Sequence, residues 1–213
     1  MHIFYPDLPN SLKNIPDPPN CLFYRGDLSL IYSDNIIAVI GSRNYSQAGN
    51  KSAIELTELL TKEGYIVVSG LALGIDAIAH QTTINNRGKT IAVLGSGIDD
   101  KSFYPKQNLS LAKRIIDNNG LILSEYAPKI KPHRQHFLKR NRIIVGLSKA
   151  IIVADVKEKS GTMASARLGL KSKKTVFMSS NVKNKQLLDL RAIDITNNSD
   201  IINLLTKYAK RVN

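Results

Sequence analysis

Short apolar runs that alternate with stretches of helical periodicity constrain the fold of this 213-residue chain more than any other feature. In the first helical stretch Ala53, Leu56 and Leu60 share one face, and Gly64 after Lys62 marks its end. This alternation is typical of βαβ units around a parallel sheet. We therefore predict an α/β fold with a doubly wound, mostly parallel sheet, an extended Rossmann-like arrangement. The predicted strands are 36–40, 66–68, 91–94, 121–123, 151–154 and 176–178.

The two ends of the chain give weaker signals. Five of the eight prolines lie in the first twenty residues, which argues against a regular helix there. We expect residues 1–33 to form an extended, proline-rich lead-in to a Rossmann-like domain over 34–213. A last strand over 192–195 and a last helix over 201–208 complete the prediction.

The charge balance predicts a polyanionic partner. Lysine and arginine number 30 against 17 acidic residues, for a net charge of +13, and nucleic acid is the first candidate. A surface that is merely well solvated is the alternative. The single cysteine, Cys21, excludes an internal disulfide and fits a reducing compartment. With neither a leader pattern nor a run of ~20 apolar residues, we expect a soluble cytoplasmic protein away from membranes.

Glycine-bearing turns follow three of the predicted strands and lead into helices. Backbone N–H groups at such turns form anion sites, and an arginine adds a bidentate donor. Ordinary βα turns are the alternative reading. Asp76 and His80 suggest an acid/base pair, but we expect Asp76 to start a helix and His80 to pack or be solvated. The turns contain Gly41-Ser42-Arg43 with Ser46, Ser69-Gly70-Leu71 with Gly74, and Ser160-Gly161-Thr162.

A basic segment follows the fourth of these strands. Arg134 lies in a predicted loop, and a helix is expected to begin near Phe137 with three cations and an amide, Lys139, Arg140, Asn141 and Arg142. Cations in a first helical turn oppose the helix dipole unless a polyanion lies opposite. Phe137 offers a ring for base stacking, or alternatively a core side chain.

Several enzyme classes are excluded by missing patterns. Only the first glycine of G-x-G-x-x-G is present at Gly41, and G-x-x-x-x-G-K-[ST] is absent, which disfavours nicotinamide cofactors and P-loop chemistry. His133 and His136 lack further metal ligands, and the G-x-S-x-G elbow is missing. We predict no cofactor, no metal and no catalysis.

Taken together, the motifs resemble the DNA-processing protein A family, also called DprA or Smf. The shared segments extend from Asp17-Pro18-Pro19 through the three glycine turns, Tyr104-Pro105 and Ser124-Glu125-Tyr126 to Ser165-Ala166-Arg167. The resemblance implies a homodimeric protein that binds single-stranded DNA and helps load a RecA-type recombinase in natural transformation (competence) and DNA recombination. The N-terminal helical domain and C-terminal winged helix of longer members are not expected here.

The same resemblance implies which residues bind DNA. Arg134 would take the family's basic position and Phe137 would contact a base, with Lys139, Arg140 and Arg142 as wider candidates. Ser46, Leu71, Gly74 and Asn141 complete the predicted interface. The phosphate pocket would consist of Gly41, Ser42 and Arg43, with Ser69, Gly70, Ser160, Gly161 and Thr162 around it.

Two alternative functions are left open. The Lonely Guy type of nucleotide phosphoribohydrolase shares the fold and has the pattern P-G-G-x-G-T-x-x-E, whose carboxylate stabilises a cationic transition state. Here Gly161-Thr162 matches, but Ser165 stands in the place of the glutamate. The other alternative is a recombinase-binding scaffold without DNA affinity.

Overall fold

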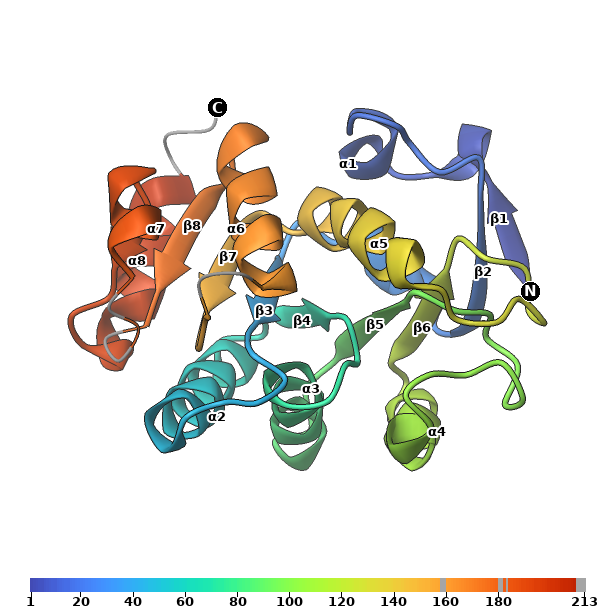
Figure 1. Ribbon diagram of the computed structural model, residues 1–213, viewed down its shortest axis with the longest axis horizontal. Helices are drawn as coiled ribbons and strands as arrows, with labels where there is room; N and C mark the ends of the chain where they lie inside the picture. The colour runs from blue at the N-terminus through green and yellow to red at the C-terminus, as the bar shows by residue number, and fades with distance from the viewer. Residues whose placement is uncertain (158–159, 180–181, 183, 210–213) are drawn as a thin grey trace.

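A single nine-stranded sheet organises the chain, in the order β1-β2-β6-β5-β4-β3-β7-β8-β9, with helices on both faces (Figure 1). The computed structural model describes residues 1–157, 160–179, 182 and 184–209. The strands are β1 His2–Phe4, β2 Cys21–Gly26, β3 Ile36–Ile40, β4 Ile66–Ser69, β5 Thr90–Leu94, β6 Leu121–Ser124, β7 Ala150–Val153, β8 Thr175–Met178 and β9 Ile193–Asp194. The helices are α1 Asn10–Lys13, α2 Gln47–Lys62, α3 Ile75–Asn85, α4 Leu109–Asp117, α5 Arg134–Leu147, α6 Gly161–Lys171, α7 Lys185–Asp189 and α8 Ile201–Ala209.

The predicted α/β fold is confirmed. The six apolar runs form β3 to β8, each within a residue of its expected ends, and the weak signals near the C-terminus form β9 and α8. All pairings between β3 and β9 are parallel, with Ile37 opposite Val67 on one side and Ala150 on the other.

The first 33 residues are more ordered than a lead-in. β2 pairs antiparallel with β6, with Tyr24 opposite Leu123, and β1 pairs antiparallel with β2 at the edge of the sheet. The expectation of no regular helix before residue 20 is wrong, because α1 follows Pro9, which occupies the N-cap position. Proline is tolerated at a helix start, where its missing N–H has no intrahelical acceptor. Leu12 of α1 is fully buried and packs near Gly146 of α5.

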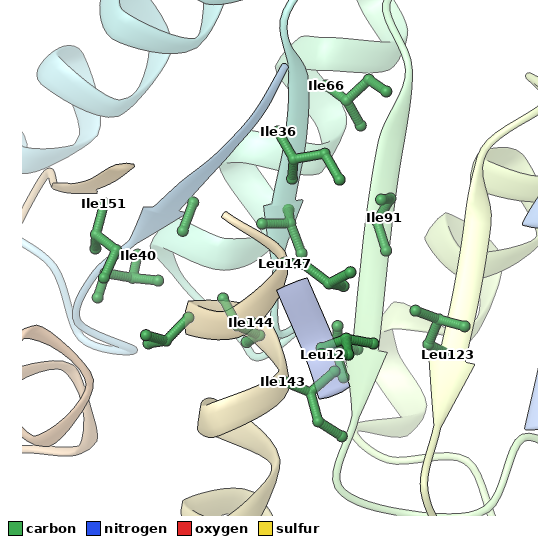
Figure 2. Close-up of a cluster of buried hydrophobic side chains, with 14 of the residues drawn as sticks. Leu12, Ile36, Ile40, Ile66, Ile91, Leu123, Ile143, Ile144, Leu147 and Ile151 are labelled. Atoms are coloured by element: carbon green, nitrogen blue, oxygen red, sulfur yellow. The ribbon is translucent and has the colours of Figure 1, made fainter. Parts of the chain in front are cut away.

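Strand β3 runs through the middle of the core and is buried on both faces. Ile36, Ala38 and Ile40 face the side covered by α5 and α6, while Ile37 and Val39 face α2 and α8. Such two-sided burial explains why the strand reads as a continuous apolar run. Figure 2 shows the α5 side, where side chains of β3, β4, β5, β6 and β7 meet Ile143, Ile144 and Leu147 of α5.

The strand order places a topological switch point between β3 and β7. The chain continues from β3 into α2 on one face of the sheet, and from β7 into α6 on the other (Figure 1). Since the two connections diverge, a crevice opens beyond the carboxyl ends of these strands. Ligands of open α/β sheets bind in such crevices.

Candidate nucleic-acid interface

A cleft of about 1400 Å³ lies at this switch point. Its walls are the turn after β3, the first turns of α5 and the start of α6. The structure thus brings together residues from three predicted motifs. The predicted site residues that line the cleft are Gly41, Ser42, Arg43, Arg134, Phe137, Arg140, Asn141, Ser160, Gly161 and Thr162.

The start of α2 already holds an anion from the protein itself. Asp155, which follows β7 and is 7% exposed, accepts hydrogen bonds from Ser46 N at 3.0 Å and Ser46 Oγ at 2.8 Å. The Asp155 carbonyl also accepts from Ser42 N at 3.2 Å, and Ser46 Oγ accepts from Gly49 N. Both donors of Ser46 are therefore satisfied internally, and its contact with DNA stays a prediction.

The side chains of Ser42 and Arg43 remain available in the cleft. Ser42 is 4% exposed, and its hydroxyl has no hydrogen-bond partner among the described residues. Within the same part of the chain Arg43 forms no ion pair. Its Cζ lies 5.8 Å from the centroid of the Phe137 ring. A buried hydroxyl and a guanidinium without a carboxylate suit an oxyanion.

The turn after β4 shapes the cleft and does not line it through the predicted residues. Ser69 is fully buried and donates to the carbonyl of Val39 at 2.7 Å, and Leu71 lies in the core. Gly74 has a φ of +85° and packs against the backbone of Ser42 and Arg43, where a Cβ would clash. Ser69, Leu71 and Gly74 therefore have structural roles in this turn, and their expected DNA contacts stay predictions.

A buried charge network lies beneath this turn. Arg140, 5% exposed, donates to the carbonyls of Gly70 at 2.6 Å and of Val93, and to Asn141 Oδ1 at 3.1 Å. Asp76 starts α3, as predicted, and accepts from Gly70 N at 3.2 Å and Ala72 N at 3.4 Å. A Cβ on Gly70 would overlap the Arg140 guanidinium. Arg140 and Asn141 line the cleft and are joined to Gly70 by this network, and the predicted DNA contacts of all three stay predictions.

Burial sets the protonation of this network. It raises the pKa of Asp76, an effect that the positive charge of Arg140 opposes. Burial lowers the pKa of Arg140 to about 10, so the guanidinium stays charged at neutral pH. The fully buried His80 packs as predicted, with Nδ1 2.7 Å from Thr90 Oγ1, and burial lowers its pKa to about 3. His80 does not line the cleft, and so low a pKa makes its imidazole a weak base, so it is not placed to act as a general base there.

Helix α5 begins earlier than predicted. It starts at Arg134, and His133 Nδ1 at the N-cap accepts from Gln135 N at 3.4 Å. The cations after Phe137 therefore lie in the middle of the helix and do not oppose its N-terminal dipole. Arg134 occupies the first turn, is exposed, and lines the cleft.

Two of the later cations belong to an internal ion-pair cluster. Arg142 Nη2 lies 2.5 Å from Glu125 Oε1, and Arg142 Nε donates to the Asp17 carbonyl at 2.7 Å. Lys139 Nζ lies 3.5 Å from Asp17 Oδ2. These contacts pin the proline-rich segment to α5. Lys139 and Arg142 thus already have carboxylate partners within the protein, and their expected DNA contacts stay predictions.

The start of α6 presents open donors. Ser160 Oγ caps the helix by accepting from Met163 N at 3.2 Å, and it donates to the Lys157 carbonyl at 2.6 Å. The N–H groups of Gly161 and Thr162 have no acceptor among the described residues. A Cβ on Gly161 would meet no described heavy atom within 4 Å. Gly161 therefore leaves free space beside two backbone donors at a helix N-terminus.

Sequence reasoning missed several residues that build the site. Asp155 follows a strand adjacent to β3, and that position at a switch point is the signal that could have found it. Tyr104, whose motif was noted without a role, lines the cleft with its ring 5.5 Å from that of Phe137. Arg167 and Gln186 line the end of the cleft nearest α7, a grouping that only the tertiary structure creates.

Metal ligation finds no support in the residues that the structure describes. They contain no group of three or more His, Cys, Asp or Glu side chains placed to hold a metal ion. His136 stacks on Tyr126 with ring centroids 3.8 Å apart. None of the helices among the described residues has the length and hydropathy of a membrane span.

Fold and cleft together define a class: Rossmann-like α/β proteins with an arginine-lined cleft at the switch point of the sheet. The chain belongs to the DNA recombination-mediator protein A family, whose model matches residues 1–206. This confirms the resemblance seen in the motifs.

Individual relatives agree with this assignment. The chain is 40% identical to DNA processing protein DprA of Bacillus subtilis over 166 residues, 78% of this chain and 55% of that protein. It is 44% identical to DprA of Streptococcus pneumoniae over 169 residues, 79% of this chain and 58% of that protein. It thus spans a little over half the length of these two relatives. The structure also matches that of Helicobacter pylori DNA processing protein A, described for its single-stranded DNA binding mode, with a TM-score of 0.87 and 33% identity over 97% of this chain and 96% of that one.

Proposed function

We propose that this protein binds single-stranded DNA in the switch-point cleft, serves DNA uptake and recombination, and catalyses no reaction. The observation that carries the proposal is the convergence of Arg43, Arg134 and the open N-terminus of α6 on one cleft. Within the described chain neither arginine has a carboxylate partner. The cleft therefore offers unbalanced positive charge at a place shaped for phosphate.

The phosphate site would be held by three kinds of donor. Arg43 supplies a bidentate fork, Ser42 a buried hydroxyl, and Gly161 and Thr162 two backbone N–H groups. The anion cannot instead occupy the start of α2, where the Asp155 carboxylate already binds. That carboxylate repels a second anion and so directs phosphate toward α6.

Phe137 would form the base platform, with Tyr104 beside it. The Phe137 ring packs over Gly95, where a Cβ would clash with it, and Tyr104 is 42% exposed. Stacking on such rings contributes about 1–3 kcal/mol per base and tolerates any base. We therefore expect binding of single strands with little sequence preference.

The hydrolase alternative lacks its essential group. Ser165 Oγ donates to the Gly161 carbonyl at 3.1 Å and is 5% exposed, so it supplies no negative charge to the cleft. Of the nearby carboxylates, Asp76 is bound to backbone N–H groups and Glu125 to Arg142. Release of free base from nucleoside monophosphates would contradict the proposal.

Family membership supports the proposed protein partners. A recombination mediator acts on a recombinase, so a RecA-type recombinase and a second copy of this chain are the partners we propose. The cytoplasm is the proposed compartment, because a single cysteine suits a reducing environment. Sizing by light scattering and recombinase pull-down with and without DNA test these partners separately.

Fluorescence anisotropy with labelled single-stranded and duplex oligonucleotides tests the DNA proposal. We expect a preference for the single strand and a salt slope of about −3, for ~4 phosphates contacted. We expect Arg43→Ala to lower both the DNA affinity and the magnitude of the salt slope. Arg114 is an exposed arginine on α4 outside the cleft, so Arg114→Ala should change neither. Equal, weak binding to both nucleic acids, or an unchanged Arg43→Ala variant, would overturn the proposal.

Gly161→Ala is the sharpest probe of the helix N-terminus. The added methyl group meets no described atom of the protein, so folding is undisturbed, and replacing glycine at a compatible position stabilises by about 0.4–1 kcal/mol. The same methyl group would, however, occupy the space that a phosphate needs to approach the backbone N–H groups closely. Reduced DNA affinity with an unchanged or raised melting temperature is the expected result.

A further inference from the structure

The cleft continues past the start of α6 to a second, unassigned end. There it is lined by Ala164 and Arg167 of α6 and by Gln186 of α7. Gly161, Ala164 and Arg167 are all exposed and three residues apart, so they lie along one face of the helix. At a rise of 1.5 Å per residue, Arg167 lies about 9 Å along the axis from Gly161.

Arg167 differs from the structural arginines in its partners. Arg25 is paired with Asp100 at 3.1 Å, and Arg142 with Glu125. Arg167 forms no ion pair within the described residues, and its Nη2 donates to the neutral Oε1 of Gln186 at 3.0 Å. The Gln186 amide orients the guanidinium without neutralising it. Arg167 thus resembles Arg43 and Arg134, the other arginines of the cleft that lack a carboxylate.

The surface between the two ends of the cleft suits a continuous strand. Gly161 and Ala164 add almost no bulk to the exposed face of α6, and Lys157 lines the same wall. No acidic side chain lines the cleft on this wall within the described residues. A backbone that leaves the N-terminus of α6 would therefore pass over small side chains before it meets Arg167.

We propose that Arg167, oriented by Gln186, binds a second phosphate of the same DNA strand, so that the strand runs along α6 from Phe137 toward α7. The inference rests on the proposed function, because it extends the same cleft. It assigns a ligand class, the phosphodiester backbone, to a part of the cleft whose residues had no assigned role in the sequence analysis. It also predicts that a strand needs a minimum length to use the whole cleft.

The test is anisotropy with a ladder of labelled oligo-dT lengths, for wild type, Arg167→Ala and Arg114→Ala. Arg114 is a matched control, since its guanidinium also donates to a glutamine, Gln81, at 2.5 Å, but on α4 across the sheet. For long oligonucleotides Arg167→Ala is expected to weaken binding about tenfold at low salt and to reduce the salt slope by about 0.7, the loss of one phosphate contact on a single strand. For the shortest oligonucleotides, which fill only the α6 site, it binds as wild type.

A second variant separates the ligand from its orientation. Gln186→Ala keeps the charge of Arg167, so we expect a smaller loss of affinity with the salt slope retained. Melting temperatures for every variant confirm folding, which substitution of an exposed side chain should leave intact. If Arg167→Ala matches Arg114→Ala at all lengths while Arg43→Ala still weakens binding, the second phosphate site is wrong and the proposed function stands. If Arg43→Ala also has no effect, both fail.

Discussion

Replacing Asp155 by alanine removes the carboxylate that caps helix α2 from another part of the chain. Asp155 accepts two hydrogen bonds from Ser46, at 3.0 Å and 2.8 Å, and is almost fully buried. Its loss leaves a backbone N–H and a hydroxyl without their acceptor. It also removes a negative charge from the N-terminal end of a helix, where the dipole favours one.

The expected cost is about 3 kcal/mol, since each hydrogen bond to a charged group contributes about 1.5–3 kcal/mol. For a chain of this size that corresponds to a fall in melting temperature of about 6–12 °C. Asp27→Ala is the matched control. Asp27 accepts from Ser29 N at 3.0 Å and from Ser29 Oγ at 2.6 Å in the same way, but in an exposed turn. Because water replaces the lost acceptor there, we expect a cost of about 1 kcal/mol or less.

Urea unfolding followed by circular dichroism measures these changes, as the chain has no tryptophan. Sulfate offers a second readout. Sulfate at ten times its Kd for the vacated N-terminus of α2 should raise the free energy of unfolding of Asp155→Ala by about 1.4 kcal/mol. This gain comes on top of the general stabilising effect of sulfate, which wild type measures. If Asp155→Ala were no less stable than Asp27→Ala, the reasoning that an internal carboxylate occupies this helix end would be refuted.

Three further predictions concern stability and the cleft. Burial lowers the pKa of His80 to about 3 from 6.5, so as the pH falls the unfolded chain takes up the proton before the folded chain does. The free energy of unfolding of wild type is therefore expected to fall by about 2 kcal/mol between pH 7 and pH 5 through this group. Urea unfolding at both pH values checks this, since His80→Gln should not show that loss. Arg142→Ala leaves Glu125 with only the more distant Lys139, 3.8 Å away, and costs about 3 kcal/mol, part of which the double variant with Glu125→Gln recovers. Gly74→Ala forces a methyl group against the Arg43 backbone, so melting temperature and DNA affinity both fall.

Much of the fold was predictable because the parallel strands are buried on both faces. A strand such as β3 needs apolar side chains at every position, and that pattern is visible without a structure. β1 and β2 escaped prediction because they are edge additions: β2 has only one fully buried position, Leu22, and so carries no such run. The short helix α1 was not predicted because the prolines around it argue against a regular helix.

The candidate site was only partly predictable. Turns that bear glycine marked the carboxyl ends of the strands, and Arg43, Arg134, Phe137 and Gly161 indeed meet in one cleft. In the basic segment nothing in the sequence showed that Lys139 pairs with Asp17 and Arg142 with Glu125. A sequence shows that a cation is present but not whether a carboxylate from a distant segment already neutralises it.

The amino-acid sequence by itself determined the class of fold, the strand ends and the excess of positive charge, because hydrophobic periodicity and net charge are local or additive properties. Only the tertiary structure decided which donors stay open. Residue 155 reaches the start of α2, and Arg140 reaches under Gly70, through contacts between segments far apart in the chain. The Asp155 carboxylate fills the start of α2, Asp76 accepts from the backbone N–H groups of the turn before α3, and the N–H groups of Gly161 and Thr162 at the start of α6 have no acceptor among the described residues.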